Sequence, residues 1–307
     1  SLKGSLEVGA PVPINANTGM SLPLGTQMDI IYYDGAVRAQ NGADKSAWKF
    51  LDAQPSANRI LRPGVLYLAA FRNATTTVRF TKDPNAQLDN TEGVASVSSY
   101  ASLTSDDRDR GWNGIANPAL FYANLDAGVT TGQVYQNGNN SYLAVDMTSE
   151  SFVMGAPVFV QVDKTQSVVI NTPAASAPVR KLMTKTSSNY SVALSQDGKT
   201  TDRVIVAIDD CAIDEYTIGQ DLAKAGVSTK VAQMWVDRYD AQLCKNTVAA
   251  DNNMAEYPLT ISAPKAGEYT IALEQIPTDG VLFLTENGSI TWNLNIAPAT
   301  LDLSKGT

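Results

Sequence analysis

Carboxylates are the side chains of this sequence with the widest scope for chemistry, because the chain contains no histidine. Without an imidazole, Ser-His-Asp, Cys-His and histidine–zinc chemistries are unavailable. Asp106, Asp107 and Asp109 alternate with arginines in SDDRDR, and Asp209-Asp210 follows an apolar run. A glycosidase needs two carboxylates about 5 Å or about 6.5–9.5 Å apart, which sequence spacing does not fix. Acids flanked by arginines are typical of solvated turns, so we predict that the chain is not an enzyme.

Two segments are rich in the oxygen ligands that calcium prefers. They are Asp83 to Asn90 and Asp251 to Asn253. Neither has the D-x-[DN]-x-[DN]-G spacing of a defined calcium loop, and Asx-rich turns explain both. We therefore expect no cofactor and leave open a structural calcium in one of them.

The aromatic side chains are candidates for stacking on sugar rings. Trp235 and Trp292 lie in apolar runs, which favours core packing. Trp112 follows the acidic SDDRDR segment and opens a strand. Trp48, in the polar segment KSAWKF, ranks first as a ligand-stacking residue, and Tyr100 is the second candidate.

The overall charge excludes some classes of partner. Lys and Arg number 23 against 31 Asp and Glu, for a net charge of −8, and the pI is about 4.6. Binding nucleic acid or anionic lipid requires a basic surface, so we expect neither. No apolar run reaches the 18 or so residues that span a bilayer, and none resembles a signal peptide. This fits either a cytosolic protein or a mature chain cut from a secreted precursor.

The elements that must position these residues are almost all short strands. Runs such as MDIIYY (28–33) are rich in β-branched or aromatic residues and are bounded by Gly, Pro, Asn or Asp. Asn-Gly supplies the positive φ angles of a tight turn and predicts hairpins around Asn137-Gly138 and Asn287-Gly288. Helix is predicted only at residues 220–225, with a short alternative at 43–51.

This pattern predicts an all-β protein of two β-sandwich domains in tandem, jelly-roll or immunoglobulin-like, with little helix. NTPAASAP (171–178) and the polar stretch after it indicate an extended linker. We place the N-terminal domain at 1–170, the linker at 171–188 and the C-terminal domain at 189–307. A long loop within one large sandwich is the alternative.

Cys211 and Cys244 are the only cysteines. Residues 203–208, just before Cys211, form one predicted strand, and Cys244 lies in the return arm of a predicted hairpin. If these strands are neighbours, a disulfide would stabilise the fold by roughly 3–4 kcal/mol. A redox pair would be expected as C-x-x-C, which is absent. The residues alone leave open a structural disulfide or two free thiols.

The chain contains, in order, the segments GWNGIANPALFYANL (111–125), QVYQNGNNSYLAV (133–145), FVMGAPVFVQV (152–162), DRVIVAIDDCAID (202–214), YPLTISAPKAGEYTIAL (257–273) and VLFLTENGSITWNLNIAPATLDLSKG (281–306). In this order, these and other segments resemble a pattern common in the C-terminal regions of large Bacteroidetes surface proteins. The likeness covers about four fifths of the chain and rests on the order of loose packing motifs. Ala116 stands where that pattern usually has glycine, and the leucine-rich repeats of related adhesins are absent.

The resemblance implies a non-enzymatic protein that is secreted or attached to the outer-membrane surface and acts as an adhesion, scaffold or stalk module. Its partner would be a host or bacterial surface protein or a glycan. An extracellular location also favours the Cys211–Cys244 disulfide. The alternatives are a carbohydrate-binding module, with Trp48 and Tyr100 exposed on one face, and a subunit of a surface fibre, with residues 1–13 lying outside their own domain.

Overall fold

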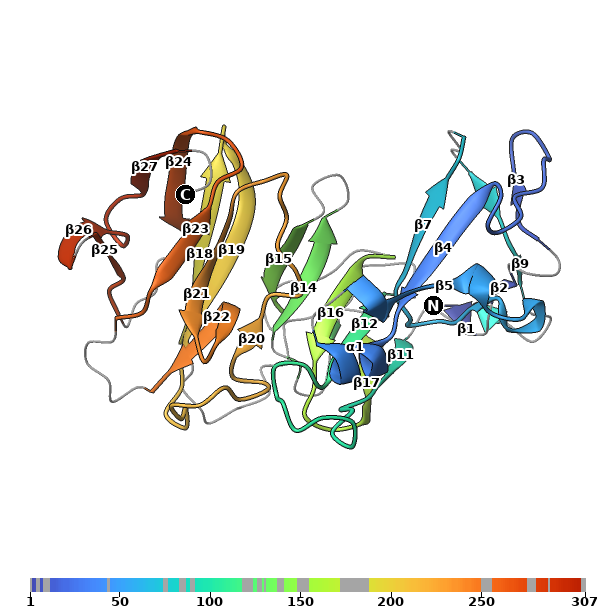
Figure 1. Ribbon diagram of the computed structural model, residues 1–307, viewed down its shortest axis with the longest axis horizontal. Helices are drawn as coiled ribbons and strands as arrows, with labels where there is room; N and C mark the ends of the chain where they lie inside the picture. The colour runs from blue at the N-terminus through green and yellow to red at the C-terminus, as the bar shows by residue number, and fades with distance from the viewer. Residues whose placement is uncertain are drawn as a thin grey trace. The chain divides into compact units, whose positions relative to one another are not determined.

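A computed structural model describes residues 2–3, 6–7, 12–42, 45–73, 77–82, 87–88, 92–117, 124–125, 129, 131–136, 141–147, 155–171, 188–249, 256–274, 280–286 and 288–304. Its regular structure is almost entirely strand, which confirms the predicted all-β fold with little helix (Figure 1). No helix in these ranges is long and apolar enough to cross a membrane.

The chain divides into two compact units. Unit 1 contains Ser1–Val129 and Met147–Pro178, and unit 2 contains Thr130–Asp146 and Val179–Thr307. This division differs from the predicted boundaries, because residues 130–146 group with the C-terminal half. Residues 172–187 of the predicted linker lie outside the described residues.

Unit 1 consists of short strands and a few helical turns. Its strands are β1 (Leu2–Lys3), β2 (Leu6–Glu7), β3 (Ile14–Asn15), β4 (Met28–Tyr33), β5 (Trp48–Phe50), β6 (Ile60–Leu61), β7 (Tyr67–Phe71), β8 (Val78–Arg79), β9 (Thr81–Lys82), β10 (Gln87–Leu88), β11 (Glu92–Val97), β12 (Trp112–Ala116), β13 (Asn124–Leu125), β16 (Pro157–Gln161) and β17 (Gln166–Asn171). Its helical segments are α1 (Gly35–Asn41) and three 3-10 turns, η1 (Lys45–Ala47), η2 (Leu51–Ala53) and η3 (Ser56–Asn58).

The central strand of one sheet in unit 1 is β4, which pairs antiparallel with β5 and β7. Alternate residues of β4 face a core, where Met28 and Ile30 are buried against Leu24 and Leu51. β12 pairs antiparallel with β16, and β11 and β13 flank β17. These pairings place the start of β12, where the acidic segment ends, next to buried side chains.

Helix α1 follows β4 directly and was not predicted. The Asp34 side chain accepts hydrogen bonds from the backbone N–H groups of Ala36 and Val37 at 3.0 and 3.4 Å, as an N-cap does. Gly42, at φ +77°, ends the helix by donating its N–H to the Arg38 carbonyl oxygen at 2.8 Å. The Asp–x₇–Gly spacing after a strand is the signal that could have found it.

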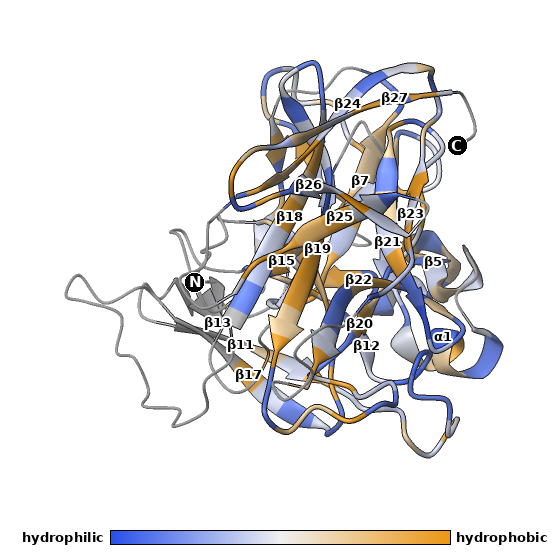
Figure 2. Ribbon diagram, turned by 90° about the vertical axis from the view of Figure 1, so that its left-hand side faces the viewer, coloured by the Kyte–Doolittle hydropathy of each residue, from blue (hydrophilic) through white to orange (hydrophobic). Residues whose placement is uncertain are grey.

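Unit 2 is organised around an eight-stranded sheet. Its strands are β14 (Thr131–Gln136), β15 (Ser141–Asp146), β18 (Ser188–Gln196), β19 (Lys199–Ile208), β20 (Leu222–Ala223), β21 (Gln233–Arg238), β22 (Ala241–Val248), β23 (Leu259–Ser262), β24 (Gly267–Leu273), β25 (Phe283–Glu286), β26 (Ser289–Asn293) and β27 (Ala299–Leu303). The large sheet has the order β23-β21-β22-β19-β18-β24-β27, and β20 pairs with β22. The second half of β19, residues 204–208, is apolar (Figure 2). Leu194, Ile205, Met234, Leu243 and Tyr269 are buried.

Three predicted hairpins are confirmed. β14 pairs with β15, β21 with β22, and β25 with β26, all antiparallel. The turn between β21 and β22 consists of Tyr239 and Asp240, both at positive φ, as a two-residue hairpin loop requires.

Both helix predictions are wrong. Residues 220–225 form a turn and the short strand β20, and residues 45–53 form 3-10 turns around β5. Asp221 of the first segment accepts hydrogen bonds from the N–H groups of Thr217 and Thr247, at 3.1 and 2.8 Å. These tertiary hydrogen bonds hold the segment in a non-helical path, and they override its helix propensity.

Candidate functional site

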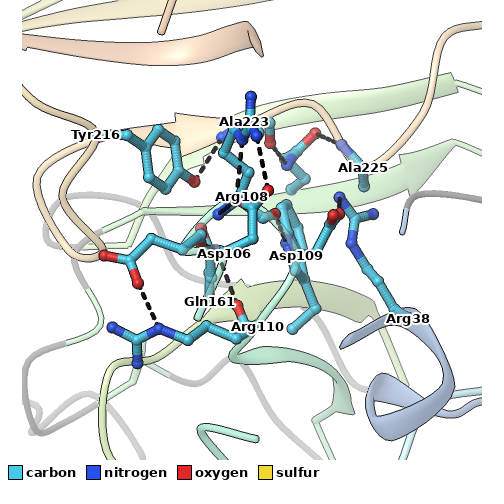
Figure 3. A network of polar contacts seen from close by, with 12 residues as sticks. Arg38, Asp106, Arg108, Asp109, Arg110, Gln161, Tyr216, Ala223 and Ala225 are labelled. Carbon is cyan, nitrogen blue, oxygen red and sulfur yellow. Dashed lines mark hydrogen bonds and ion pairs between the residues drawn. The ribbon is translucent and has the colours of Figure 1, made fainter. Parts of the chain in front are cut away.

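The acidic segment of unit 1, residues 105–110, is the first candidate, and we call it the acidic loop. Each of its carboxylates pairs with an arginine (Figure 3). Asp106 binds Arg108 through both carboxylate oxygens, at 2.9 and 2.7 Å. The Gln161 side chain donates to two carbonyl oxygens of the loop, those of Asp107 and Arg110, at 2.6 and 2.9 Å. These contacts tie the loop to strand β16.

Arg38 of helix α1 holds the other side of the acidic loop. Its side chain is buried, and its Nη2 lies 3.7 Å from Asp109 Oδ1. The guanidinium lies 4.3 Å from the centre of the Trp112 ring, a cation–π contact. The fully buried Trp112 donates its indole N–H to the Arg108 carbonyl oxygen at 2.8 Å. Helix α1, the loop and β12 are thereby fastened to one another.

The electrostatics of the acidic loop follow from these pairs. The hydrogen bonds from Arg108 lower the pKa of Asp106, because they favour its charged form. Burial is the largest influence on Asp109 and raises its pKa, while Arg38 opposes that effect. Asp106, Asp107 and Asp109 each pair with an arginine and so help to fix the loop.

Two of the predicted aromatic residues lie beside Tyr33. Trp48 pairs with Tyr33 across β4 and β5, with ring centres 5.4 Å apart and the rings edge to face. Tyr100 lies close enough to Tyr33 to influence its pKa, which burial raises. Trp48 also packs edge to face on Phe159, at 5.7 Å. Trp48 packs in a cluster of rings with Tyr33 and Phe159. Trp48 and Tyr100 are both partly exposed, so both reach the surface.

The remaining tryptophans differ in burial. Trp235 is buried, as predicted, and its indole N–H donates to Asp237 Oδ1 at 2.9 Å. Trp292 is only partly buried in the β25–β26 hairpin, so its predicted core position is not fully realised.

The second candidate is a buried charged pair in unit 2. Lys224 Nζ lies 2.6 Å from Asp202 Oδ2, and the two side chains are 1% and 0% exposed. Asp202 Oδ2 also accepts the N–H of Met234 at 2.7 Å, and Oδ1 accepts the N–H of Arg203 at 2.9 Å. Burial raises the pKa of Asp202, and Lys224 opposes that effect. Sequence reasoning missed this pair because its members lie in different elements.

Further contacts fix the β19–β21 connection, residues 209–232, which contains Lys224. Gln133 of β14 donates to the Ala223 carbonyl oxygen at 2.8 Å and accepts the N–H of Ala225 at 2.9 Å (Figure 3). Lys245 donates to the Gly219 carbonyl oxygen at 3.4 Å, and burial lowers its pKa. The charged groups of this unit thus also hold a long connection against its sheet.

Comparisons with known proteins do not identify a relative of the sequence. No protein-family model matches it, and neither does any curated protein or solved structure. The resemblance to Bacteroidetes surface proteins therefore stays a prediction.

Cys211 and Cys244 are both free thiols in the structure, which therefore does not show the disulfide. β19 and β22 are neighbours as expected, but they run parallel with Ile205 beside Lys245. Cys244 therefore lies beside position 204 of β19. The end of β19, at Ile208, is four residues or about 13 Å further along the strand, and Cys211 lies in the turn after it. A disulfide needs Cα atoms within about 7 Å.

We expect one fast and one protected thiol. Cys211 is exposed, whereas Cys244 is buried, donates to the Leu222 carbonyl oxygen at 3.4 Å and has its pKa raised to about 12 by burial. A thiol reagent at neutral pH should label Cys211 in the native protein and Cys244 only after unfolding, because the thiolate is the reactive form. Cys211→Ser should abolish the fast phase. Two thiols that appear only after reduction would instead demonstrate a disulfide.

The predicted calcium segments fall mainly outside the described residues. Within the part of the chain that is described, no group of three or more Cys, Asp or Glu side chains is arranged to hold a metal ion.

We expect Asp106→Asn to lower the melting temperature at pH 7. The pKa of Asp106 in the folded state lies below its ordinary value of 3.8, so the folded state favours the carboxylate. That stabilisation is present above the unfolded pKa and is lost as the pH falls through the folded pKa. Melting temperatures of the two proteins should therefore converge as the pH falls below 3.8. Asp163→Asn is the control, since Asp163 is exposed and 4.0 Å from Lys164. A pH-independent difference would contradict this account.

Proposed function

We propose that the chain is a non-enzymatic, secreted or cell-surface protein of two β-sandwich domains in tandem, acting as an adhesion, scaffold or stalk module. The observation that supports it best is that the charged residues of two clusters bind one another. In unit 1 the carboxylates of the acidic loop bind arginines, and in unit 2 Asp202 binds Lys224. Both clusters hold loops against sheets, as a rigid binding or spacer module requires. The ordered sequence motifs and the acidic charge agree with this role.

The first experiment tests location. Intact cells that produce the protein are treated with a protease and probed with an antibody to the chain. We expect the chain to be degraded while a cytoplasmic marker survives. Protection of the chain in intact cells, with degradation after lysis, would overturn the proposal.

A carbohydrate-binding module is the second candidate, because Trp48 and Tyr100 both flank Tyr33 and remain partly exposed. Stacking on a sugar ring is the chemistry that such aromatic residues provide. The purified chain and its Trp48→Ala variant are compared on a glycan array, with melting curves to show that both are folded. Glycan binding that the variant loses would select this candidate, and binding to surface proteins but to no glycan would select the adhesion module.

The fibre-subunit alternative gains no support from the N-terminal segment. β1 pairs with β10, and β2 lies between β6 and β9, all within unit 1. The described residues of this segment therefore complete their own unit.

A further inference from the structure

The Asp202–Lys224 pair places an amine and a carboxyl group in contact where water is excluded. The donor and acceptor atoms are 2.6 Å apart, and neither side chain is more than 1% exposed. The pair lies among the buried residues Met234, Cys244 and Ala223. An ion pair without solvent carries a large desolvation cost. Transfer of one proton within the pair yields an uncharged amine and an uncharged carboxylic acid, which removes that cost.

Both reacting groups are held in position by backbone contacts. Asp202 lies on β19, and its two carboxyl oxygens accept the N–H groups of Met234 and Arg203. The backbone N–H of Lys224 donates to the Gln242 carbonyl oxygen at 2.7 Å. The N–H donors on the carboxyl oxygens resemble the oxyanion-binding arrangement that stabilises charge developing during acyl transfer. The geometry therefore brings the amine to the carboxyl group and holds both carboxyl oxygens in place.

We propose that Lys224 and Asp202 are a modification site at which an intramolecular amide bond forms between the Lys224 Nζ and the Asp202 Cγ. The ammonium first gives one proton to the carboxylate. The neutral nitrogen then attacks Cγ, the N–C bond forms, the C–OH bond breaks, and a second nitrogen proton leaves with the hydroxyl group as water. The amide nitrogen keeps one hydrogen. No oxidant, reductant or other co-reactant is needed.

The burial of Asp202 supports this step independently. Desolvation raises the pKa of its carboxyl group, so burial favours the protonated form. The hydroxyl group of this carboxylic acid is the group that leaves as water. The amide would tie the β19–β21 connection covalently to β19. A chain used as an adhesion or stalk module would gain resistance to unfolding by force or protease, although the bond itself does not depend on that function.

Intact mass spectrometry of the purified, unfolded protein tests the proposal. We expect the wild-type mass to be lower than the mass of its sequence by one water molecule. Proteolytic digestion should release one branched peptide that joins the segments containing Asp202 and Lys224. The wild-type measurement needs no variant, so it does not depend on whether any variant folds.

Variants identify the residues from which the water is lost. Lys224→Arg and Asp202→Ala should each have the full mass of their own sequences, because arginine is not a comparable nucleophile and alanine has no carboxyl group. Lys199→Arg, an exposed residue of the same strand as Asp202, should keep the loss. A wild-type protein with the full mass of its sequence would overturn the proposal. So would a loss of water that persists in Lys224→Arg, because it would place the dehydration elsewhere.

Discussion

Lys224→Met is expected to lower the free energy of unfolding by about 3–5 kcal/mol at pH 7, because it leaves the buried Asp202 without its cation. Asp202 would keep only the N–H groups of Met234 and Arg203 as partners. Without Lys224, which lowers its pKa, the carboxyl group of Asp202 should have a still higher pKa in the folded state. Urea unfolding followed by circular dichroism measures the loss.

The pH dependence of that loss has a definite sign. An acid whose folded pKa lies above its unfolded pKa binds more protons in the folded state, so stability falls as the pH rises between the two values. The penalty of Lys224→Met should therefore be smaller near pH 4 than at pH 7. A penalty that grows on acidification would contradict the assigned cause.

Two further variants separate the contributions at this pair. Lys199→Met, on an exposed part of β19, should change the free energy of unfolding by no more than about 0.5 kcal/mol. Asp202→Leu combined with Lys224→Met removes both charges and should recover much of the loss, since apolar replacements of buried ion pairs are often neutral. No difference between Lys224→Met and Lys199→Met would show that the pair is not important for stability.

The hairpins could be predicted because the residues that determine each one are close together in the sequence. In β14–β15, β21–β22 and β25–β26 the two strands are adjacent in sequence, and their period-2 pattern and turn residues decide the pairing. The 220–225 segment shows where local patterns fail. Its Asp221 and Lys224 are used by partners on β22 and β19, and no window around the segment contains those partners.

The same limit applies to the candidate sites. The alternation of acids and arginines in SDDRDR indicated a solvated turn, and within it the pairs Asp106–Arg108 and Asp107–Arg110 form. Asp109 instead pairs with Arg38 of an unpredicted helix. For the cysteines, adjacency of β19 and β22 was predictable, but their parallel register was not. The distance between two side chains depends on that register.

Trp112→Ala is expected to cost about 3–5 kcal/mol of unfolding free energy, the range for truncating a fully buried tryptophan. The indole is 0% exposed, donates to the Arg108 carbonyl oxygen and lies under the Arg38 guanidinium. Truncation therefore removes apolar packing, one hydrogen bond and one cation–π contact together. Urea unfolding of the whole chain, followed by circular dichroism, measures the loss of unfolding free energy.

Trp112→Phe and Trp48→Ala are the matched controls. Phenylalanine keeps a ring beneath Arg38 and removes the indole hydrogen bond, so its cost should be clearly smaller than that of alanine. Trp48 is only partly buried and packs edge to face on Tyr33, so Trp48→Ala should also cost less than Trp112→Ala. If Trp48→Ala lowered the free energy of unfolding as much as Trp112→Ala, the ring cluster around Tyr33 would be a main source of stability in unit 1. Trp48 would then be a structural residue, and this would count against its role in stacking on a sugar.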